Sequence, residues 1–271
     1  MAKQKDEPIR AGRLVVVTYR DSLPGQLYEA PIFAAGDLAF VAEVVGDRYL
    51  LRCGEREAWV DADGVAPHAN LDGGARYPFP IARVLAEEAA ALLAPACERV
   101  EIAGSIRRGK PDPGDIEILC VPRRHYRTTT DMFGGGATHS LAHDELAALW
   151  AQLWLESGAV EPRLDKNGRR AWGDRYRRAW FRSASGGVMA LDLFAVIPPA
   201  QFGAILAIRT GPADFSQALV TPRRKGGAMP HGYRLLDGVL LGPQGTVETP
   251  EEADFFAPTC RTLQVARAGT E

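Results

Sequence analysis

Residues 103–121 read AGSIRRGKPDPGDIEILCV, and this stretch decides the fold. Its second half predicts a strand, because Ile116 and Ile118 alternate with the acidic residues Asp115 and Glu117. Alternate side chains of a strand point to the same face, so both carboxylates project from one side, about 6.5–7 Å apart. Two carboxylates at this spacing can bracket a pair of divalent cations about 3.5–4 Å apart.

The residues just before this strand are suited to binding phosphate. Gly104 permits close approach of the backbone to a ligand, and Ser105 follows it with a hydroxyl group. Positive charge is supplied nearby by Arg107, Arg108 and Lys110. Carboxylates for metal, next to a glycine-serine turn and arginines for phosphate, are what phosphoryl or nucleotidyl transfer requires.

The remaining periodicity predicts an α+β chain. Runs of about five residues alternate apolar and polar between turn signals over 11–67, which favours short strands closing into a small barrel. From Pro80 the period is helical, with Ile81, Val84, Leu85, Leu92, Leu93 and Cys97 on one face. The further elements that we expect are strands at 100–103, 116–121 and 187–197, a flexible loop at 128–140, a helix at 141–156, a hairpin turning at Asp237-Gly238, and a helix capped by Thr249.

Composition limits the class of protein. The 271 residues are 46% hydrophobic and 24% charged, which is typical of a globular chain and excludes a disordered or fibrous one. The sequence has no apolar run long enough to span a membrane and no signal peptide, so we expect a cytoplasmic protein without a membrane partner. The four cysteines, Cys53, Cys97, Cys120 and Cys260, are far apart, and we expect reduced, mostly buried thiols.

Charge is distributed unevenly. The formal net charge is −2, yet residues 161–236 hold 13 Lys and Arg against 5 Asp and Glu, a net +8. Within this block, 163–182 interleaves arginines with Trp172, Tyr176 and Trp180. Such a composition suits a surface that follows a nucleic-acid strand. A solvated arginine face with aromatic residues in the core is the alternative.

The motif in 103–121 resembles the palm motif of family X DNA polymerases, a group within the nucleotidyltransferase superfamily. A Gly-Ser pair, nine residues and then Asp-apolar-acidic-apolar is the shared pattern. Asp192 in MALDLFAV matches the third metal-binding carboxylate, and Thr210-Gly211 resembles the turn at the nucleotide site. TPEEADFF at 249–256 resembles a helix of the thumb, so the resemblance covers about residues 80–257.

The resemblance implies roles for these residues. Asp115, Glu117 and Asp192 would be catalytic and would bind two Mg²⁺ ions, or Mn²⁺, with Asp192 accepting or orienting the proton of the primer 3′-hydroxyl. The residues that would bind the nucleotide are Gly104, Ser105, Arg108, Gly114, Thr210 and Gly211. The basic block suggests DNA contacts for Arg175, Arg177 and Arg178.

Departures from the family pattern are informative. Ile208 and Arg209 stand where the family has two aromatic residues, so weaker exclusion of ribonucleotides is expected. Ala190 replaces a basic residue, and the family's closing Tyr-x-x-Pro-x-x-Arg is absent. We expect neither a lyase domain nor a phosphatase domain. His139 and His143 have the spacing of a zinc site, but polar residues at a helix start explain them better.

These observations predict three parts. Residues 1–76 would form an accessory β-barrel similar to bacterial Src-homology-3-like modules. Residues 77–200 would form a nucleotidyltransferase palm, which is a mixed sheet with helices on one face. Residues 201–271 would form a small thumb. The expected function is DNA polymerase activity of the family X type, adding dNMP from dNTP to a primer in short gaps during repair. A monomer acting on primer–template or gapped DNA is expected. The alternatives are transfer to an RNA end or another acceptor, or a catalytically idle nucleic-acid-binding relative.

Overall fold

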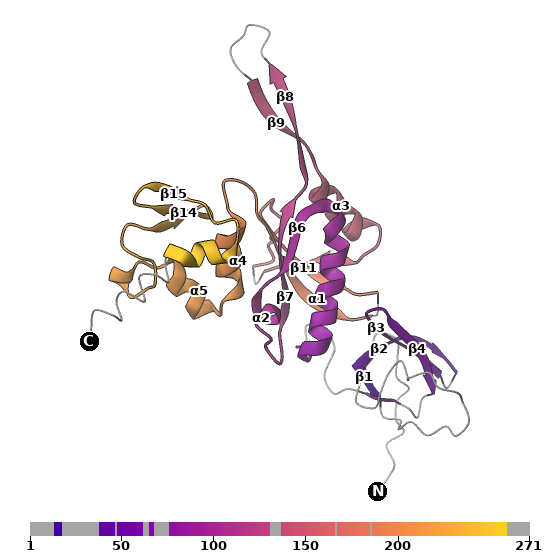
Figure 1. Ribbon diagram of the computed structural model, residues 1–271. Coiled ribbons are helices and arrows are strands. Elements are labelled where there is room, and N and C mark those ends of the chain that lie inside the picture. Colours follow the sequence, from indigo (N-terminus) through magenta and orange to yellow (C-terminus); the bar gives the residue numbers. More distant parts are fainter. Residues whose placement is uncertain are drawn as a thin grey trace, which may run out of the picture.

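The protein has a mixed α+β fold in the computed structural model, which describes residues 14–17, 38–46, 48–61, 65–67, 76–130, 137–165, 167–184 and 186–258. An N-terminal sheet, a central sheet with helices and a C-terminal region follow one another along the chain (Figure 1). Within the described residues, none of the helices combines the length and the apolar character needed to cross a membrane.

The N-terminal sheet confirms the predicted short strands. Its five strands are antiparallel neighbours in the order β4-β3-β2-β1-β5. They are β1 (Leu14–Val17), β2 (Leu38–Val45), β3 (Arg48–Cys53), β4 (Arg56–Asp61) and β5 (Val65–Pro67). The edge strands β4 and β5 are not paired with each other, so the described residues form an open sheet and not the expected closed barrel.

The central sheet has the strand order β10-β11-β12-β7-β6. Strands β7 and β12 are parallel neighbours, whereas the other neighbouring strands are antiparallel, so the sheet is mixed. Its strands are β6 (Cys97–Ile102), β7 (Asp115–Pro122), β10 (Val160–Pro162), β11 (Tyr176–Arg182) and β12 (Val188–Ala195). The predicted strands at 100–103, 116–121 and 187–197 are therefore confirmed, within one to three residues at each end.

Two helices pack against one face of this sheet. The helix α1 (Phe79–Leu93) buries Ile81, Leu85 and Leu93 as predicted, and α3 (Glu145–Leu155) buries Trp150 beside it. A short 3₁₀ helix, η2 (Ala94–Ala96), directly follows α1. Two expectations for this face were wrong, because Leu92 is 40% exposed and Cys97 already belongs to β6.

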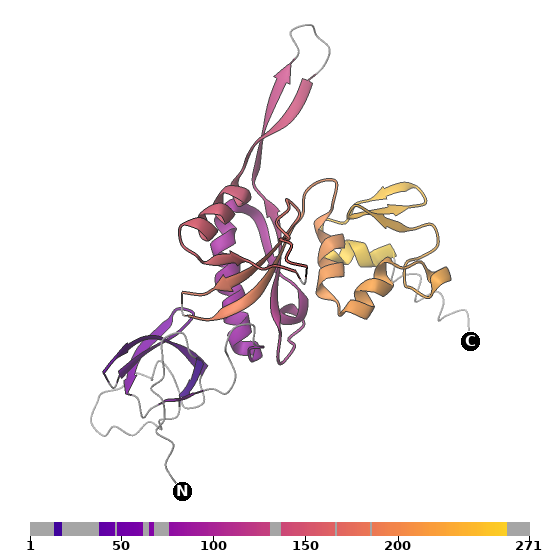
Figure 2. The same ribbon diagram turned by 180° about the vertical axis from the view of Figure 1, so that it is seen from behind.

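The expected loop at 128–140 is largely a β-hairpin. Strand β8 (Arg124–Thr130) pairs antiparallel with β9 (Ala137–Asp144), and the hairpin projects from the body of the molecule (Figure 2). Consequently α3 begins at Glu145, four residues later than predicted, with the Asp144 side chain accepting a hydrogen bond from the Ala147 N–H at 2.9 Å. His139 and His143 thus lie on a strand, where their spacing does not place them one helical turn apart.

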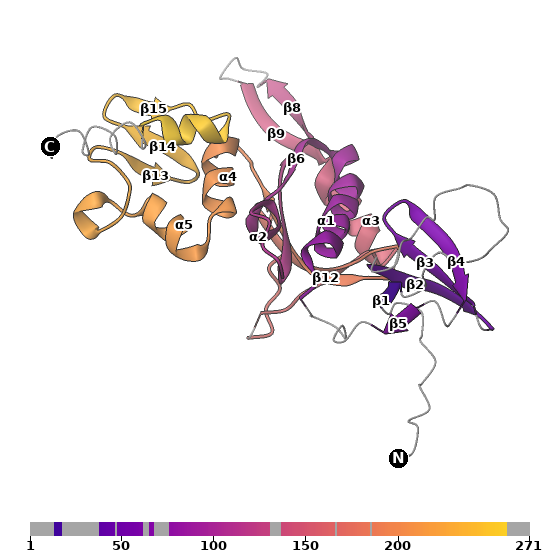
Figure 3. The ribbon, with the colours of Figure 1, turned by 60° about the horizontal axis from the view of Figure 1, so that its bottom comes forward.

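The N-terminal sheet shares its hydrophobic core with the central region (Figure 3). Phe40 of β2 is 2% exposed, and its ring lies 5.8 Å from that of Tyr77 in an edge-on arrangement. The Tyr77 hydroxyl is 3.1 Å from both the N–H and the C=O of Val188 on β12. A side chain at Gly187 would collide with Phe40 and Leu85, at 2.6 and 2.8 Å from its Cβ. One continuous core therefore links the two sheets.

The C-terminal region combines small helices with a three-stranded sheet. Its elements are α4 (Phe202–Thr210), α5 (Ala213–Val220), the 3₁₀ helix η3 (Arg223–Lys225), β13 (Arg234–Leu236), β14 (Val239–Gly242), β15 (Gly245–Val247) and a helix at 252–258. The turn at Asp237-Gly238 is confirmed, and both residues have positive φ angles of 50° and 80°, as a tight hairpin turn requires.

The last helix starts later than predicted. Thr249 does not cap it, because its hydroxyl donates to Gln201 Oε1 at 2.8 Å and its side chain is buried. The helix begins at Glu252, and the Asp254 carboxylate accepts a hydrogen bond from the Glu251 N–H at 2.9 Å. The position of this helix is thus fixed by contacts to α4.

The cysteines agree with the prediction where they are described. Cys53, Cys97 and Cys120 are buried thiols, and Cys260 lies outside the described residues. Mutual hydrogen bonding and burial of Cys97 and Cys120 raise the pKa of the Cys120 thiol, which keeps this thiol protonated. These side chains are components of the core.

Candidate active site

Three carboxylates share one face of the central sheet. Asp192 on β12 is directly opposite Glu117 on β7, and Asp115 is opposite Ala190. Neighbouring strands lie about 4.8 Å apart, so Asp192 and Glu117 are adjacent on the sheet surface. The apolar residues that alternate with them, including Ile116 and Leu191, are buried in the core on the opposite face. The period-two pattern thus brings together the three residues predicted to be catalytic.

The backbone at Gly104 lies against the Glu117 carboxylate. After β6 the chain makes a single helical turn, α2 (Gly104–Arg107), at the position of the expected glycine-serine turn. Gly104 has a φ angle of +62°, and a Cβ built on it would lie 1.6 Å from Glu117 Oε2. Glycine is required here both by the backbone conformation and by the lack of space.

Burial and mutual repulsion perturb the acidic pair. Burial raises the pKa of Glu117 to about 7, and the negative charges of Asp115 and Asp192 contribute in the same direction. The pKa of Asp115 is also raised, first by burial and then by Asp192. Carboxylates that resist ionisation in this way form a site of negative potential, which a cation would relieve.

Basic and phenolic groups surround Asp192. Arg163 Nη2 donates to Asp192 Oδ1 at 2.6 Å, and Arg178 Nε is 3.4 Å from the same oxygen. The Tyr176 hydroxyl donates to Oδ2 at 3.2 Å. Burial, followed by the charge of Asp192, raises the pKa of Tyr176 to about 12. Tyr176 therefore remains a hydrogen-bond donor near neutral pH.

The predicted nucleotide-binding residues lie on both sides of the contact between α2 and α4. Ser105 Oγ is buried and has no hydrogen-bond partner among the described residues. Arg108 Nη1 donates to the backbone carbonyl of Thr210, the last residue of α4. Gly211 follows, where a Cβ would lie 2.4 Å from the Phe215 ring. Arg108 thus joins the end of α2 to the end of α4, and Ser105, with an unsatisfied hydroxyl, lies on α2 three residues before it.

Gly114 lies just before β7, close to a basic side chain. A Cβ on Gly114 would be 3.8 Å from the Arg76 guanidinium carbon. Arg76 Nη1 in turn donates to the Asp112 carbonyl at 3.1 Å, and its charge acts to lower the pKa of Asp115. The loop before the acidic strand therefore has a guanidinium group on one side.

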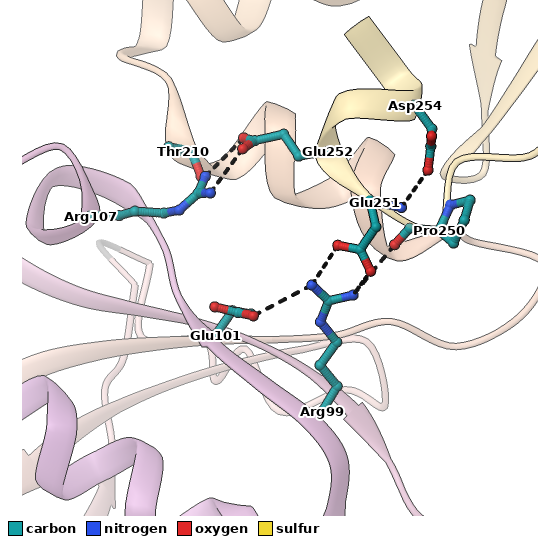
Figure 4. A network of polar contacts seen from close by, with 8 residues as sticks. All are labelled: Arg99, Glu101, Arg107, Thr210, Pro250, Glu251, Glu252 and Asp254. Carbon is teal, nitrogen blue, oxygen red and sulfur yellow. Dashed lines mark hydrogen bonds and ion pairs between the residues drawn. The ribbon is translucent and has the colours of Figure 1, made fainter. Parts of the chain in front are cut away.

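Two arginine–glutamate pairs join the central region to the C-terminal region (Figure 4). Arg107 Nη1 and Nη2 each donate to a Glu252 oxygen at 2.8 Å, and Nη1 also donates to Thr210 Oγ1 at 2.9 Å. Arg99 forms a similar fork with Glu251, at 2.6 and 2.8 Å. Such bidentate pairs restrict orientation as well as adding energy, so they set how α4 faces the carboxylates.

The three arginines predicted to contact DNA have different environments. Arg175 is exposed, whereas Arg178 faces Asp192 as part of the acidic site. Arg177 is only 6% exposed, and its guanidinium carbon is 5.7 Å from the Trp150 ring centroid. Burial lowers the pKa of Arg177. The burial of Arg177 removes it from the residues that a bound strand could contact, and the aromatic residue Trp172 packs against the core in the same way.

The carboxylates suit magnesium by their chemistry. Oxygen ligands from Asp and Glu are those that Mg²⁺ prefers. Burial is the main cause of the raised pKa of Glu117, and the negative charges of Asp115 and Asp192, which such an ion would neutralise, add to it. Within the described part of the chain, the side chains do not form a ready group of three or more His, Cys, Asp or Glu residues for a metal. Asp192 is instead engaged by Arg163, Arg178 and Tyr176.

Sequence reasoning missed four residues of this site. Tyr176 could have been found, because it alternates with Arg178 on β11 and so faces the same side. Arg107 was noted only as positive charge, although its partners are Thr210 and Glu252. Arg163 and Arg99 contact residues 29 and 152 positions away, and no local pattern signals such contacts.

Comparisons with protein-family models and with curated proteins found no match for this chain.

Proposed function

We propose that this protein is a DNA polymerase of the family X type that adds dNMP from dNTP to a primer 3′-hydroxyl, releasing pyrophosphate. The observation that carries the proposal is the meeting of Asp115, Glu117 and Asp192 on one sheet face, with Gly104 against Glu117. In this proposal the central region is the palm, the C-terminal region is the thumb, and the N-terminal sheet corresponds to a Src-homology-3-like accessory module.

Each residue of the site would have a distinct task. Asp115, Glu117 and Asp192 would hold two Mg²⁺ ions, which supply charge stabilisation for the phosphoryl group and lower the pKa of the attacking hydroxyl when bound. Asp192 would also orient the primer hydroxyl. The buried Ser105 hydroxyl and the Arg108 guanidinium would bind the triphosphate. The backbone of Thr210 and Gly211 would lie against the sugar and base.

The contacts of Asp192 and Arg108 would have to be replaced when metal and nucleotide bind. Asp192 interacts with Arg163 and Arg178, and Arg108 with the Thr210 carbonyl. A metal and a triphosphate would therefore exchange with contacts inside the protein when they bind. Oppositely charged ligands compensate for that exchange, because the metal replaces guanidinium groups at Asp192 and the phosphate replaces a carbonyl at Arg108.

A second candidate function is nucleotidyl transfer to an acceptor other than DNA. The observation in its favour is Arg209, which stands where the resembling family has an aromatic residue that helps exclude ribonucleotides. Its guanidinium carbon lies 4.0 Å from the Phe194 ring centroid, so the side chain packs on the sheet. This replacement concerns the sugar of the incoming nucleotide, so an RNA 3′ end offered together with NTPs is the combination to test first.

Primer-extension gels test both candidates. Gapped DNA, single-stranded DNA and RNA are each offered with dNTPs or NTPs in the presence of Mg²⁺. We expect extension on gapped DNA, and its loss in Asp115→Asn, Glu117→Gln and Asp192→Asn. The matched control is Asp61→Asn, which removes an exposed carboxylate on β4. Near-normal extension by Asp192→Asn would overturn the assignment of the three carboxylates.

A further inference from the structure

The β8–β9 hairpin is a large feature that the proposed transfer chemistry does not use. It projects away from the body of the protein in every ribbon view (Figures 1, 2 and 3). An isolated two-stranded ribbon is marginally stable, and the base of this one is anchored. Arg124 Nε lies 2.6 Å from Asp144 Oδ2 across the two strands, with side chains only 11% and 12% exposed.

One face of β8 is basic. Arg123, which precedes the strand, and His125 and Arg127 alternate along the chain, and all three are exposed. Within the described residues, neither Arg123 nor Arg127 forms an ion pair with a carboxylate. His125 stacks on His143 of β9, with ring centroids 6.0 Å apart, and its Nε2 is 2.5 Å from Glu145 Oε1. The face therefore carries two guanidinium groups that no carboxylate of the described residues pairs with.

This basic face continues the face of the catalytic carboxylates. The Arg123 N–H donates to Ala96 O at 2.9 Å, and its C=O accepts from the Glu145 N–H at 3.1 Å, so the chain stays extended from β7 into β8. The odd-numbered residues from Asp115 to His125 thus follow one side. The pairing of β8 with β9 shifts register between His125 and Tyr126, and Arg127 lies on β8 just beyond this shift. At about 3.3 Å per residue, Arg123 is about 20 Å and Arg127 about 33 Å along the chain from Glu117.

We propose that Arg123 and Arg127 bind the phosphate backbone of the DNA substrate about six to ten nucleotides from the reacting end. The distance follows from a rise of about 3.4 Å per nucleotide in each strand. The proposal rests on the proposed function, because the carboxylates define where the reacting end lies. Guanidinium groups form strong hydrogen bonds with phosphate. A protein partner would instead favour the opposite face, where Tyr126 and Leu141 are 54% and 45% exposed.

The test measures equilibrium binding of fluorescent gapped DNA by polarisation, without Mg²⁺ or dNTP, across a series of NaCl concentrations. Two substrates are used, with duplex arms of 6 or 16 base pairs, each closed by a short loop so that it stays annealed. The variant Arg123→Ala/Arg127→Ala is compared with the wild type. The matched control is Arg48→Ala/Arg83→Ala, which removes two exposed arginines from β3 and α1.

We expect the hairpin variant to bind the long-armed DNA at least 10-fold more weakly, with a log–log salt slope reduced by about 1.8 for two lost phosphate contacts. The short-armed DNA should lose at most one contact, and the control should match the wild type. Equal slopes for variant and wild type on the long-armed DNA would overturn the proposal. So would a loss of DNA binding that appears only with Tyr126→Ala/Leu141→Ala, which would place the DNA contact on the opposite face of the hairpin.

These experiments distinguish a failure of the hairpin proposal from a failure of the polymerase proposal. If the chain binds DNA with the expected dependence on arm length but never extends a primer, the contact of Arg123 and Arg127 with DNA stands and the polymerase proposal fails. If primers are extended normally while the slopes are equal, only the hairpin proposal fails.

Discussion

Gly104 and Glu117 are so close that a Cβ on the glycine would lie 1.6 Å from Oε2 of the glutamate. We therefore predict that Gly104→Ala displaces the Glu117 carboxylate and lowers the rate of nucleotide incorporation by about 100-fold, since small misplacements of reacting groups have effects of this size. Single-turnover extension assays would measure the change.

The control for this prediction is Gly109→Ala. Gly109 has a similar φ angle of +69°, but a Cβ there would meet nothing within 4 Å. Both variants place an alanine at a positive φ angle, and only Gly104→Ala meets the carboxylate. Equal losses of activity in the two variants would show that strain alone, and not the contact with Glu117, is responsible.

The raised pKa of Glu117 predicts a pH-dependent stability in metal-free buffer. The pKa is about 7 in the folded protein and near 4.5 in the unfolded chain, so the folded state binds more protons between these values. The free energy of unfolding therefore falls as pH rises from about 4.5 to 7. We expect the melting temperature of Glu117→Gln to exceed that of the wild type by a margin that grows from pH 5 to pH 8.

Added Mg²⁺ should reduce the difference in melting temperature between Glu117→Gln and the wild type at pH 8, because a cation at the carboxylates would offset their repulsion. A difference in melting temperature that stays constant with pH would contradict the raised pKa of Glu117. Thermal unfolding followed by circular dichroism gives both measurements.

The pair Arg107–Glu252 should contribute measurably to stability. We predict a coupling free energy of about 1 kcal/mol from a double-mutant cycle with Arg107→Ala and Glu252→Gln, because the pair is bidentate and partly shielded from water. The same cycle on Arg182 and Glu161, an exposed pair at 2.8 Å, should give a value near zero. Arg107→Ala should also raise KM for the nucleotide by loosening α4. A coupling free energy no larger than that of the exposed pair would contradict a stabilising role of the Arg107–Glu252 pair.

The shared core predicts that the N-terminal sheet and the central region unfold together. Phe40→Ala should reduce the free energy of unfolding by about 3–5 kcal/mol, whereas Trp59→Ala, at an exposed position of β4, should change it by much less. Calorimetry should give one transition that covers both sheets. Two separate transitions, with only the first shifted by Phe40→Ala, would indicate an independent N-terminal domain.

Ile208 and Arg209 predict weak discrimination against ribonucleotides. The ratio of kcat/KM for dNTP over NTP should be below about 10⁴, which corresponds to about 5.5 kcal/mol. Replacing Ile208 with Tyr should increase the ratio by restoring an aromatic side chain before Thr210-Gly211. A wild-type ratio above that value would contradict the prediction.

The sequence predicted the parts of the fold that have a strong apolar period. Ile116, Ile118 and Leu191 are core residues that force the intervening carboxylates to one face, so the acidic site could be deduced. The same period would have separated buried Arg177 from Arg178, because Ala179 and Phe181 are buried on the same side as Arg177. The composition of the basic block concealed that alternation.

Other parts had no local signal. The predicted loop at 128–140 and helix start at 141 are wrong, because a β-ribbon without a core beneath it needs no apolar alternation that would reveal it in the sequence. Closure of the N-terminal sheet depends on distant pairing and could not be inferred from short strands alone. The contacts of Arg99 and Arg163 depend on how distant segments pack, which a single sequence does not encode in any short pattern.

The common core of the two sheets also constrains how the chain is made. The apolar faces of β2 and β3 leave the ribosome early, yet other members of the same hydrophobic core, including Met189 and Leu191, are about 150 residues further on. At about 5–20 residues per second this interval is about 8–30 s. The first strands therefore stay incompletely buried during synthesis. Full burial of their apolar faces has to wait for the translation of β12, the strand that carries Asp192.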